Sequence, residues 1–487
     1  MQICYVHQFL YLYNFLLFQN PIFFRQPAQN AVVGVQGAYY NPAGLTLLDK
    51  GWHFYVGDQM TIQTREITST YAPFAAGVKN NGNATKRFKG KTFAPVIPNV
   101  DVVYNHGRWA ASFHFGFISG GGSCSFDDGL GSFEAPMALL PSAVNALAGS
   151  MGMTGGVFSG YDTQISFTGQ NMGASGQFNF SYKLIDADMH KLSLSAGIRV
   201  NYLSNDYTGG IRNYQLGMGG TMIPAVIGMT GFLSNVIDPA QAQMFAQSLC
   251  ADREVDCTQT GWALTPVLSA HYRVSIVDIA LRYEFNTRVR LKNKTVKDGG
   301  LAQFADGEET AADIPGLLSG GVNVHILPVL RVGAGFNLYL DKSATYGGNR
   351  QELLGGNTFE GYFGAEWDIC KLFTLSAGTQ ITRFHLGENN QYCTDMSFSL
   401  PNWSLGGGGR FNINEHFGID FSIFKTFYEH AVKTYTDYGN AGATYATALK
   451  PVMTNLSDDL LNQLKVPGKD DFYRTSLCFG LGLVMKF

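Results

Sequence analysis

Charged side chains are scarce in this sequence. Asp, Glu, Lys and Arg together make up 15% of its 487 residues, whereas a soluble domain has about 25%. The cations form no Lys/Arg run and the net charge is −3, so the composition gives no reason to expect a nucleic-acid partner. The body of the chain has no stretch of about 18 apolar, charge-free residues, which argues against membrane-spanning helices.

Catalytic motifs are absent too. The chain has no G-x-S-x-G nucleophile elbow, no H-E-x-x-H and no Walker loop, and no Ser or Cys motif surrounds His114, His271 or His325. We therefore expect no enzyme, no cofactor and no metal site. Cys250 and Cys257 enclose a short polar segment, and in an oxidising compartment such a pair is expected to form a disulfide.

Glycine and aromatic residues are abundant instead, with 58 Gly, 36 Phe and 24 Tyr. In the C-terminal segment two kinds of residue alternate. The odd positions are Tyr473, Thr475, Leu477, Phe479, Leu481, Leu483, Met485 and Phe487, and the even ones are Arg474, Ser476, Cys478, Gly480, Gly482, Val484 and Lys486. A period of two with one face for lipid and one for a wet lumen is typical of a strand in a membrane barrel.

Runs of this kind recur along the chain. They predict fourteen strands, near 52–68, 88–105, 108–119, 161–184, 190–208, 259–272, 275–293, 312–326, 329–346, 357–370, 372–387, 394–413, 416–433 and 470–487. The connections alternate between short and long, as in outer-membrane barrels with short periplasmic turns and long external loops. Strands that face lipid must also close into a ring to satisfy their backbone groups. The predicted fold class is therefore all-β: a 14-stranded antiparallel transmembrane β-barrel.

The N-terminal residues precede the first strand. The apolar run Phe9–Phe18 lacks a basic segment before it and a cleavage site after it. We interpret residues 1–18 as the remnant of a secretion signal, and the alternative is a genuine short anchor. Residues 19–50 are expected to form a plug, or hatch, and residues 51–487 the barrel. The terminal Phe487 resembles the signal that bacterial barrels present to the outer-membrane barrel assembly machinery, which is an expected partner.

Two motifs carry a family resemblance. The segment Y-N-P-A-G-L (Tyr40–Leu45) is followed by Trp52 and an alternating strand, and Pro95 and Pro98 frame the start of the second predicted strand. Both features resemble the FadL/TodX family, outer-membrane transporters of long-chain fatty acids and aromatic hydrocarbons. The resemblance covers nearly the whole chain.

The resemblance implies a plug inside the barrel, ligand capture between external loops, and lateral exit near a kink in the third strand. The matching hatch residues are Asn41, Pro42, Ala43 and Gly44, although N-P-A-G on its own would also suit a simple turn. The candidates for the wall kink are Gly116, Gly120 and Gly121, because glycine weakens strand pairing. Glycines at this place could equally just start a loop.

Two long loops, 133–158 and 217–248, are unusually apolar for segments that face water. They supply the ligand-binding candidates Phe133, Met137, Leu140, Ile227, Phe232 and Leu233, and the spacing in 217–248 predicts short amphipathic helices. The alternative is that these loops only pack on each other as a lid. The family builds its groove from the loops after strands five and seven, whereas here the loop after strand seven (294–311) is short and polar.

Arg282 and Arg288 are candidate partners for a ligand carboxylate, because Arg offers a forked donor. Pairing of these cations with Asp278 and Glu284 on the same strand face is the alternative. The sequence does not identify the hydrophobic ligand.

The expected function is transport of hydrophobic small molecules across the outer membrane of a Gram-negative bacterium, with outer-membrane lipid as a further partner. Two other functions stay open. A general diffusion porin would share the barrel but needs no apolar loops, and an adhesive or structural barrel would act through its loops alone. A TonB-dependent receptor, with 22 strands and a folded plug, does not fit this length.

Overall fold

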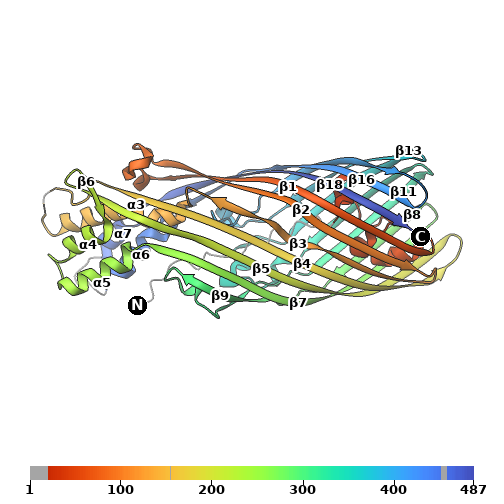
Figure 1. Cartoon of the computed structure of the whole chain (residues 1–487), viewed down its shortest axis with the longest axis horizontal. Helices are drawn as coiled ribbons and strands as arrows, with labels where there is room; N and C mark the ends of the chain where they lie inside the picture. The colour runs from red at the N-terminus through yellow and green to blue at the C-terminus, as the bar shows by residue number, and fades with distance from the viewer. Residues whose placement is uncertain (1–19, 154, 451–457) are drawn as a thin grey trace.

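The computed structural model describes residues 20–153, 155–450 and 458–487. Residues 1–18, where we expect a signal remnant, lie outside the described residues. Each strand pairs antiparallel with its neighbour, and β1 closes the sheet against β18 (Figure 1). The strands are β1 (Gly51–Tyr71), β2 (Thr85–Asn105), β3 (Trp109–Phe126), β4 (Gly160–Asp186), β5 (His190–Met218), β6 (Thr221–Pro224), β7 (Arg253–Val274), β8 (Val277–Glu284), β9 (Arg290–Asp298), β10 (Glu309–Ala311), β11 (Leu317–Leu327), β12 (Leu330–Tyr339), β13 (Thr358–Cys370), β14 (Phe373–Arg383), β15 (Asn402–Asn412), β16 (Phe417–Tyr428), β17 (Ala431–Tyr435) and β18 (Gly468–Lys486).

Within the described residues the barrel wall is fourteen strands around, because some of the labelled strands continue one another along the same neighbour. β9 continues β8 along β7, β10 and β11 together face β9 and β8, and β17 continues β16 along β18. β6 is a short arm that folds back on the end of β5. The predicted 14-stranded antiparallel barrel is confirmed.

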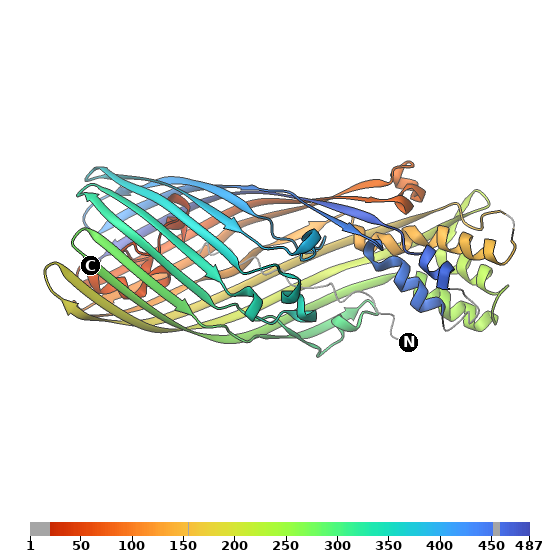
Figure 2. The ribbon, with the colours of Figure 1, turned by 180° about the vertical axis from the view of Figure 1, so that it is seen from behind.

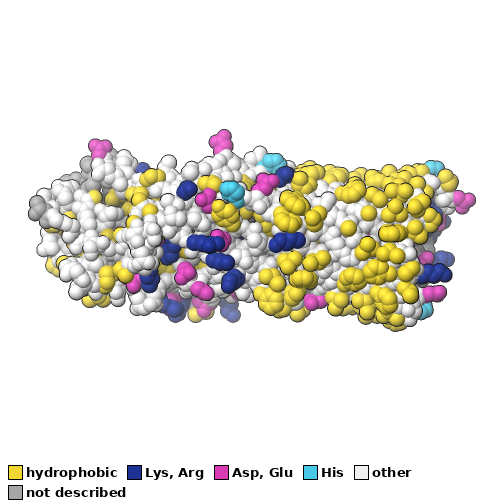
Figure 3. All heavy atoms as spheres, turned by 90° about the horizontal axis from the view of Figure 1, so that it is seen from above, with side chains coloured by type: hydrophobic (Ala, Val, Ile, Leu, Met, Phe, Trp, Pro, Cys, Tyr) yellow, Lys and Arg dark blue, Asp and Glu magenta, His cyan; other side chains and the backbone are white. Residues whose placement is uncertain are grey.

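The outer face of the barrel wall is apolar over the half of the barrel that ends in short turns. Figure 3 shows this belt, with charged side chains gathered beyond it. Members of the belt include Phe178, Phe180, Leu264, Leu281, Phe363, Trp403, Ile423 and Leu481, all exposed. Inward positions of the same strands are polar and buried, among them Gln177, Asn179, Ser181, Ser269, Asp278 and Arg282. An apolar belt about 25 Å tall around a polar interior is the pattern of a barrel that spans a lipid bilayer.

The two ends of the barrel differ. At one end lie the short turns and the C-terminus, where Phe487 exchanges two backbone hydrogen bonds with Trp52. Helices cover the other end (Figures 1 and 2). They are α3 (Gly131–Ser150), α4 (Ala225–Leu233), α5 (Pro239–Cys250), α6 (Ala441–Leu449) and α7 (Asp458–Gln463). α4 and α5 confirm the helices predicted in 217–248. Among the described residues, no helix has both the length and the apolar character needed to cross a bilayer.

The expected disulfide is wrong. Both cysteines are free thiols in the structure. Cys250 ends α5, where burial raises the pKa of its thiol to about 12. Cys257 lies in β7, and its Sγ accepts a hydrogen bond from the hydroxyl of Thr295 at 3.2 Å. α5 places the Cys250 thiol among the helices α3 to α7 that cover the outer end of the barrel, which we call the cap. β7 places the Cys257 thiol in the barrel wall, so closeness in sequence does not bring the two thiols together.

Candidate functional site

The N-terminal segment 20–48 lies inside the barrel, near the short-turn end (Figures 1 and 2). It forms α1 (Pro21–Arg25), α2 (Gly37–Tyr40) and the 3-10 helix η1 (Pro42–Leu47). α1 contacts β15, β16 and β18, whereas η1 contacts β4, β5 and β7 on another side of the wall. Nearly every residue of the segment is buried. We call residues 20–48 the hatch.

The hatch motif starts η1. The Asn41 side chain accepts a hydrogen bond from the Gly44 amide at 3.3 Å, and Pro42 occupies the first helical position, where a missing N–H costs nothing. The Ala43 amide donates to Ser269 Oγ at 3.1 Å, and Ser181 Oγ donates to the Pro42 carbonyl at 2.7 Å. The four predicted hatch residues are therefore all buried, and the inward side chains of β4 and β7 hold them.

One side chain of the barrel wall, His271, contacts the Asn41 side chain directly. Asn41 Nδ2 donates to the Val32 carbonyl at 3.2 Å and lies 2.9 Å from His271 Nδ1. Because the amide nitrogen can only donate, His271 Nδ1 accepts, and the ring proton sits on Nε2. Nε2 then donates to Asp278 Oδ1 at 2.9 Å, and Arg273 donates twice to the same carboxylate. A chain of buried polar contacts thus links the motif to β8.

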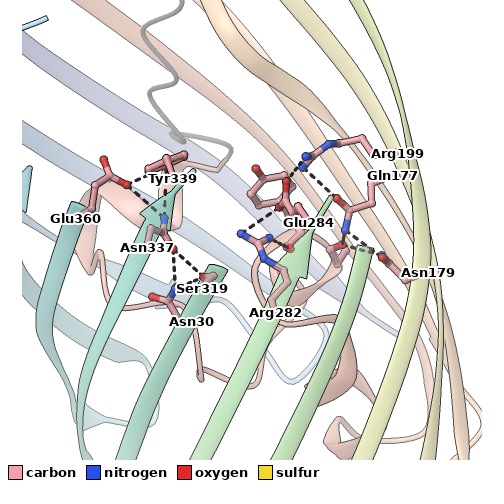
Figure 4. A network of polar contacts seen from close by, with 12 residues as sticks. Asn30, Gln177, Asn179, Arg199, Arg282, Glu284, Ser319, Asn337, Tyr339 and Glu360 are labelled. Atoms are coloured by element: carbon pink, nitrogen blue, oxygen red, sulfur yellow. Dashed lines mark hydrogen bonds and ion pairs between the residues drawn. The ribbon is translucent and has the colours of Figure 1, made fainter. Parts of the chain in front are cut away.

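Charged side chains form a layer against α2 (Figure 4). Arg199 forms an ion pair with Glu284, and Arg282 lies 3.3 Å from the same carboxylate. Arg282 also donates to the Tyr39 carbonyl, and its guanidinium lies 4.8 Å from the centre of the Tyr39 ring. The structure therefore places Arg282 in the alternative role, pairing within the protein and with the hatch.

Arg288 does not face the lumen. The strand is interrupted between β8 and β9, and the inward positions change from even numbers before the break to odd numbers after it. Arg288 is therefore exposed on the outer surface, and its prediction as a lumen-side ligand partner is wrong.

A second polar network holds the middle of the hatch (Figure 4). Asn30 Nδ2 donates to Ser319 Oγ at 2.6 Å and to Asn337 Oδ1 at 3.2 Å. Asn337 in turn donates to the buried carboxylate of Glu360, which also accepts from the Tyr339 hydroxyl at 2.9 Å. The lower lumen is thus occupied and hydrogen-bonded on several sides.

At the opposite end, α3 lies over the barrel mouth, and buried contacts fix it there. Glu134 accepts from Lys86 of β2 at 2.6 Å and from the Tyr161 hydroxyl of β4 at 2.8 Å. The Ser132 amide donates to Asp395 Oδ2 at 2.8 Å. α3 is therefore anchored to three separate parts of the barrel.

An apolar cavity of about 90 Å³ lies beneath α3. We call it the outer pocket. Two of the ligand-binding candidates, Phe133 and Met137, line it from the helix. Its other lining residues are Ser132, Pro136, Ser166, Phe167, Gly209, Gly210, Ile211, Arg253, Val255, Gly299, Leu301 and Phe304.

The remaining apolar candidates are elsewhere. Leu140, Phe232 and Leu233 are buried in the packing of the cap, while Ile227 is 63% exposed on α4. None of these four described residues lines the outer pocket. The loop 217–248 folds into two helices that pack against each other, so most of its apolar side chains serve as a lid.

The wall is interrupted between β2 and β3. The two strands pair over 100–105 and again at Lys91, and within the described chain residues 92–99 are not paired with β3. Pro95 and Pro98 lie in this stretch and have no N–H to donate. Along β2 the sequence thus contains a physical cause for the lost pairing.

On the other side of this wall gap, β3 shifts its register against β4 twice, the second time between Gly120 and Gly122. Gly120 has φ +74°, and a Cβ there would lie 1.7 Å from a backbone oxygen of β4, so a side chain would force the strand to move. Gly121 lies within the second shift, whereas Gly116 pairs regularly with Ser175.

A cavity of about 100 Å³ lies behind the wall gap, and we call it the wall cavity. The unpaired stretches of β2 and β3 form one of its sides. Its lining residues are Gln59, Thr61, Gln63, Arg65, Thr92, Ala94, Ile97, Phe117, Gly120, Gly122, Cys124, Gly169, Asn171 and Arg474.

Sequence reasoning missed several of these residues. Phe167, Ile211 and Val255 belong to the inward face of long strands, and only at the outer ends does that face become apolar. A change from polar to apolar inward residues along one strand was the available signal. Arg65 and Arg474 had a weaker signal, since each is simply an inward charge in an alternating strand.

No family model and no curated protein sequence matches this chain. Solved structures do match. TbuX, a toluene transporter of Ralstonia pickettii, is 14% identical over 96% of this chain and 98% of its own, with a TM-score of 0.52. A FadL homologue of Pseudomonas aeruginosa is 14% identical over 96% and 98%, with a TM-score of 0.55. TodX, a toluene transporter of P. putida, is 12% identical over 94% and 95%, with a TM-score of 0.51.

The chain has the fold of the FadL/TodX channels. These alignments run over nearly the whole length of both partners, so the FadL/TodX likeness predicted from Y-N-P-A-G-L is confirmed at the level of fold. By their titles, TbuX and TodX are toluene transporters.

Proposed function

We propose that this barrel takes up hydrophobic small molecules across the outer membrane of a Gram-negative bacterium. The observation that carries the proposal is the outer pocket. It is apolar, it lies at the mouth of the barrel under α3, and it is built from the inward ends of β4, β5 and β7. Water-facing ends of a barrel do not normally keep so much apolar surface without a ligand or partner.

The route then leads sideways. A ligand released from the outer pocket would move inward to the wall cavity and leave through the wall gap between β2 and β3. Two features favour this exit over the axial one: the gap opens beside the apolar belt, and the hatch occupies the lower lumen. We propose a sealing role for the hatch, with Asn41, Pro42, Ala43 and Gly44 at its fixed end.

A general diffusion porin is the main alternative. It requires a continuous wet channel along the axis, and the hatch contacts several sides of the wall across that axis. The comparisons also favour transport of hydrophobic solutes, since TbuX and TodX are toluene transporters.

The test is binding of oleate and of toluene to the purified barrel, together with sugar flux through it. Each Phe buried against a ligand contributes about 1.5–3 kcal/mol. The double variant F133S/F304S should therefore weaken binding at least about tenfold. I227S, which changes an exposed residue outside the outer pocket, is the matched control and should bind like the parent.

A parent protein that binds neither ligand and lets small sugars pass freely would be a porin. Equal weakening by I227S and by F133S/F304S would remove the outer pocket as the capture site.

A further inference from the structure

Two lysines lie on the outer surface of β2, at the end of the wall gap that is nearer the cap. Lys89 and Lys91 both point outward and are exposed. Lys91 is the register partner of Ser125 on β3, and at this pair the two strands meet again beyond the gap. Within the part of the chain that the structure describes, neither lysine forms an ion pair or a side-chain hydrogen bond.

The outward faces of β1, β2 and β3 carry a net positive charge at this level. Glu66 on β1 is the register partner of Lys89, but each of its carboxylate oxygens lies 2.5 Å from the guanidinium group of Arg87. The described carboxylates that follow the end of β3, those of Asp127 and Asp128, form no ion pair with either lysine. One guanidinium thus neutralises one carboxylate, and the charges of the two lysines favour an anionic ligand.

Hydroxyl groups flank Lys91 on both sides. Its register partners are Thr64 on β1 and Ser125 on β3, and both point outward like Lys91. Ser125 Oγ accepts a hydrogen bond from the Thr168 hydroxyl at 3.0 Å, so its own proton is available to another acceptor. An ammonium group beside hydroxyl donors suits the charged oxygens of a phosphate.

The next row of outward side chains toward the short turns is apolar. Its members are Leu477, Ile62 and Phe93, which are register partners on β18, β1 and β2. Phe93 is 60% exposed and belongs to the stretch of β2 that, in the described structure, is not paired with β3. Two residues of a strand span about 7 Å, so an apolar chain that starts from a head group at Lys91 would run beside Phe93.

An exposed tyrosine marks the same level as the membrane interface. Tyr473 on β18 is 41% exposed and is the register partner of Glu66, which in turn pairs with Lys89. Membrane barrels carry girdles of aromatic side chains at both interfaces, and their short turns face the periplasm. Lys89 therefore lies at the level of the lipid head groups on the external side, where Figure 3 shows the apolar belt giving way to charged side chains.

We propose that Lys89 and Lys91 bind the phosphate group of an outer-leaflet lipid, whose acyl chain then lies along Phe93 and covers the wall gap from outside. Ser125 adds a hydrogen bond to the same phosphate. A phosphate monoester suits the site better than a zwitterionic head group, because no cation of its own offsets its charge. Such a lipid site goes beyond the proposed uptake function, since its occupant is a component of the membrane and lies outside the barrel.

The experiment measures the binding of phosphatidate and of diacylglycerol, with identical oleoyl chains, to the purified barrel by native mass spectrometry. The parent should bind phosphatidate at least about tenfold more tightly, because the two lipids differ only in the charged group that the lysines would bind. K89Q/K91Q should lose this preference, whereas K89R/K91R keeps both charges and should retain most of it. K292Q/K294Q is the matched control and should behave like the parent, since these two exposed lysines alternate on β9 where the wall is paired on both sides.

A second readout locates the acyl chain. A phosphatidate with a photoreactive diazirine in the middle of one chain should label residues 92–99 of the parent. The same probe should no longer label this stretch in K89Q/K91Q.

Equal binding of both lipids by the parent would overturn the site, and this result needs no variant to fold. A phosphatidate preference that survives in K89Q/K91Q, or that falls equally in K292Q/K294Q, would also overturn it, because the lipid would then follow the overall charge of the surface. Labelling spread evenly around the apolar belt would contradict the position of the chain. None of these results depends on ligand capture at the outer pocket.

Discussion

Substitution of Asn41 by Ala tests whether the hatch motif fastens the hatch. The Asn41 side chain donates to the Val32 carbonyl, contacts His271 Nδ1 and accepts from the Gly44 amide, at 3.2, 2.9 and 3.3 Å. A typical hydrogen bond contributes about 0.5–1.5 kcal/mol net, and a buried group left without its partner costs about 1–3 kcal/mol. N41A should therefore lower the local stability of the hatch by roughly 2–4 kcal/mol.

Hydrogen exchange measures this loss directly. Amides in residues 30–48 should exchange about 30- to 1,000-fold faster in N41A than in the parent, since about 1.4 kcal/mol is one decade. The barrel strands should keep their protection, because their amides are hydrogen-bonded to neighbouring strands around the closed sheet. T46V is the control: it removes mainly the 2.6 Å contact between the Thr46 and Ser193 hydroxyls and should accelerate exchange by about a decade or less.

Two results would refute this reasoning. Unchanged exchange of residues 30–48 in N41A would mean that the motif does not hold the hatch. Equal loss of protection in the hatch and in the strands would mean that the substitution destabilises the whole barrel instead.

Two further predictions concern the wall and the cap. G120A places a Cβ on a residue with φ +74° and only 1.7 Å from a backbone oxygen of β4, so the strand must move at the wall gap, at a cost beyond the about 1–2 kcal/mol of the left-handed conformation alone. Oleate uptake by cells should therefore fall, while oleate binding to the purified barrel stays within about twofold. G176A, whose Cβ would lie an ordinary 3.4 Å from the Phe113 ring, should transport normally, and equal uptake by both variants would argue against exit at the wall gap. Burial raises the pKa of the Asp395 carboxyl, which accepts a hydrogen bond from the Ser132 amide at the start of α3. The folded state then binds more protons than the unfolded state, so hydrogen-exchange protection in the first turn of α3 should decrease as the pH rises above about 4, the ordinary carboxyl pKa, and should decrease less in D395N. A flat profile in the parent would contradict the assignment.

The strands of the barrel wall were predictable because each is encoded by its own stretch of sequence. An alternating run such as 473–487 shows its lipid face and its lumen face without reference to any other strand. The prediction failed where the alternation is interrupted. The inward-facing positions are even-numbered before the break between β8 and β9 and odd-numbered after it. A prediction that assumed uninterrupted alternation therefore assigned Arg288 to the wrong face. No turn signal in the sequence marks this interruption.

The sites were less predictable because they join residues from distant strands. The outer pocket needs Phe133 of α3 next to Phe304 of a loop that looked short and polar. The wall cavity needs Arg65 and Arg474, which meet only because the first and last strands close the ring. In contrast, Pro95 and Pro98 indicate the wall gap in the sequence itself, because they remove two backbone N–H donors from β2.

The distribution of polarity inside the barrel favours a lateral route over an axial one. Below the outer pocket the inward side chains become polar and charged, as with Arg199, Glu284 and Asp278, which form ion pairs and hydrogen bonds between strands of the wall. A hydrocarbon chain that moved straight down this path would lose about 0.8 kcal/mol for each CH₂ that leaves apolar contact. At the wall gap, by contrast, Ile97 and Phe117 line the cavity and Val96 is exposed outside it. On the proposed lateral route an apolar ligand therefore meets the smaller barrier where the wall is open, and the role proposed for the hatch is to keep water and ions out of the axis.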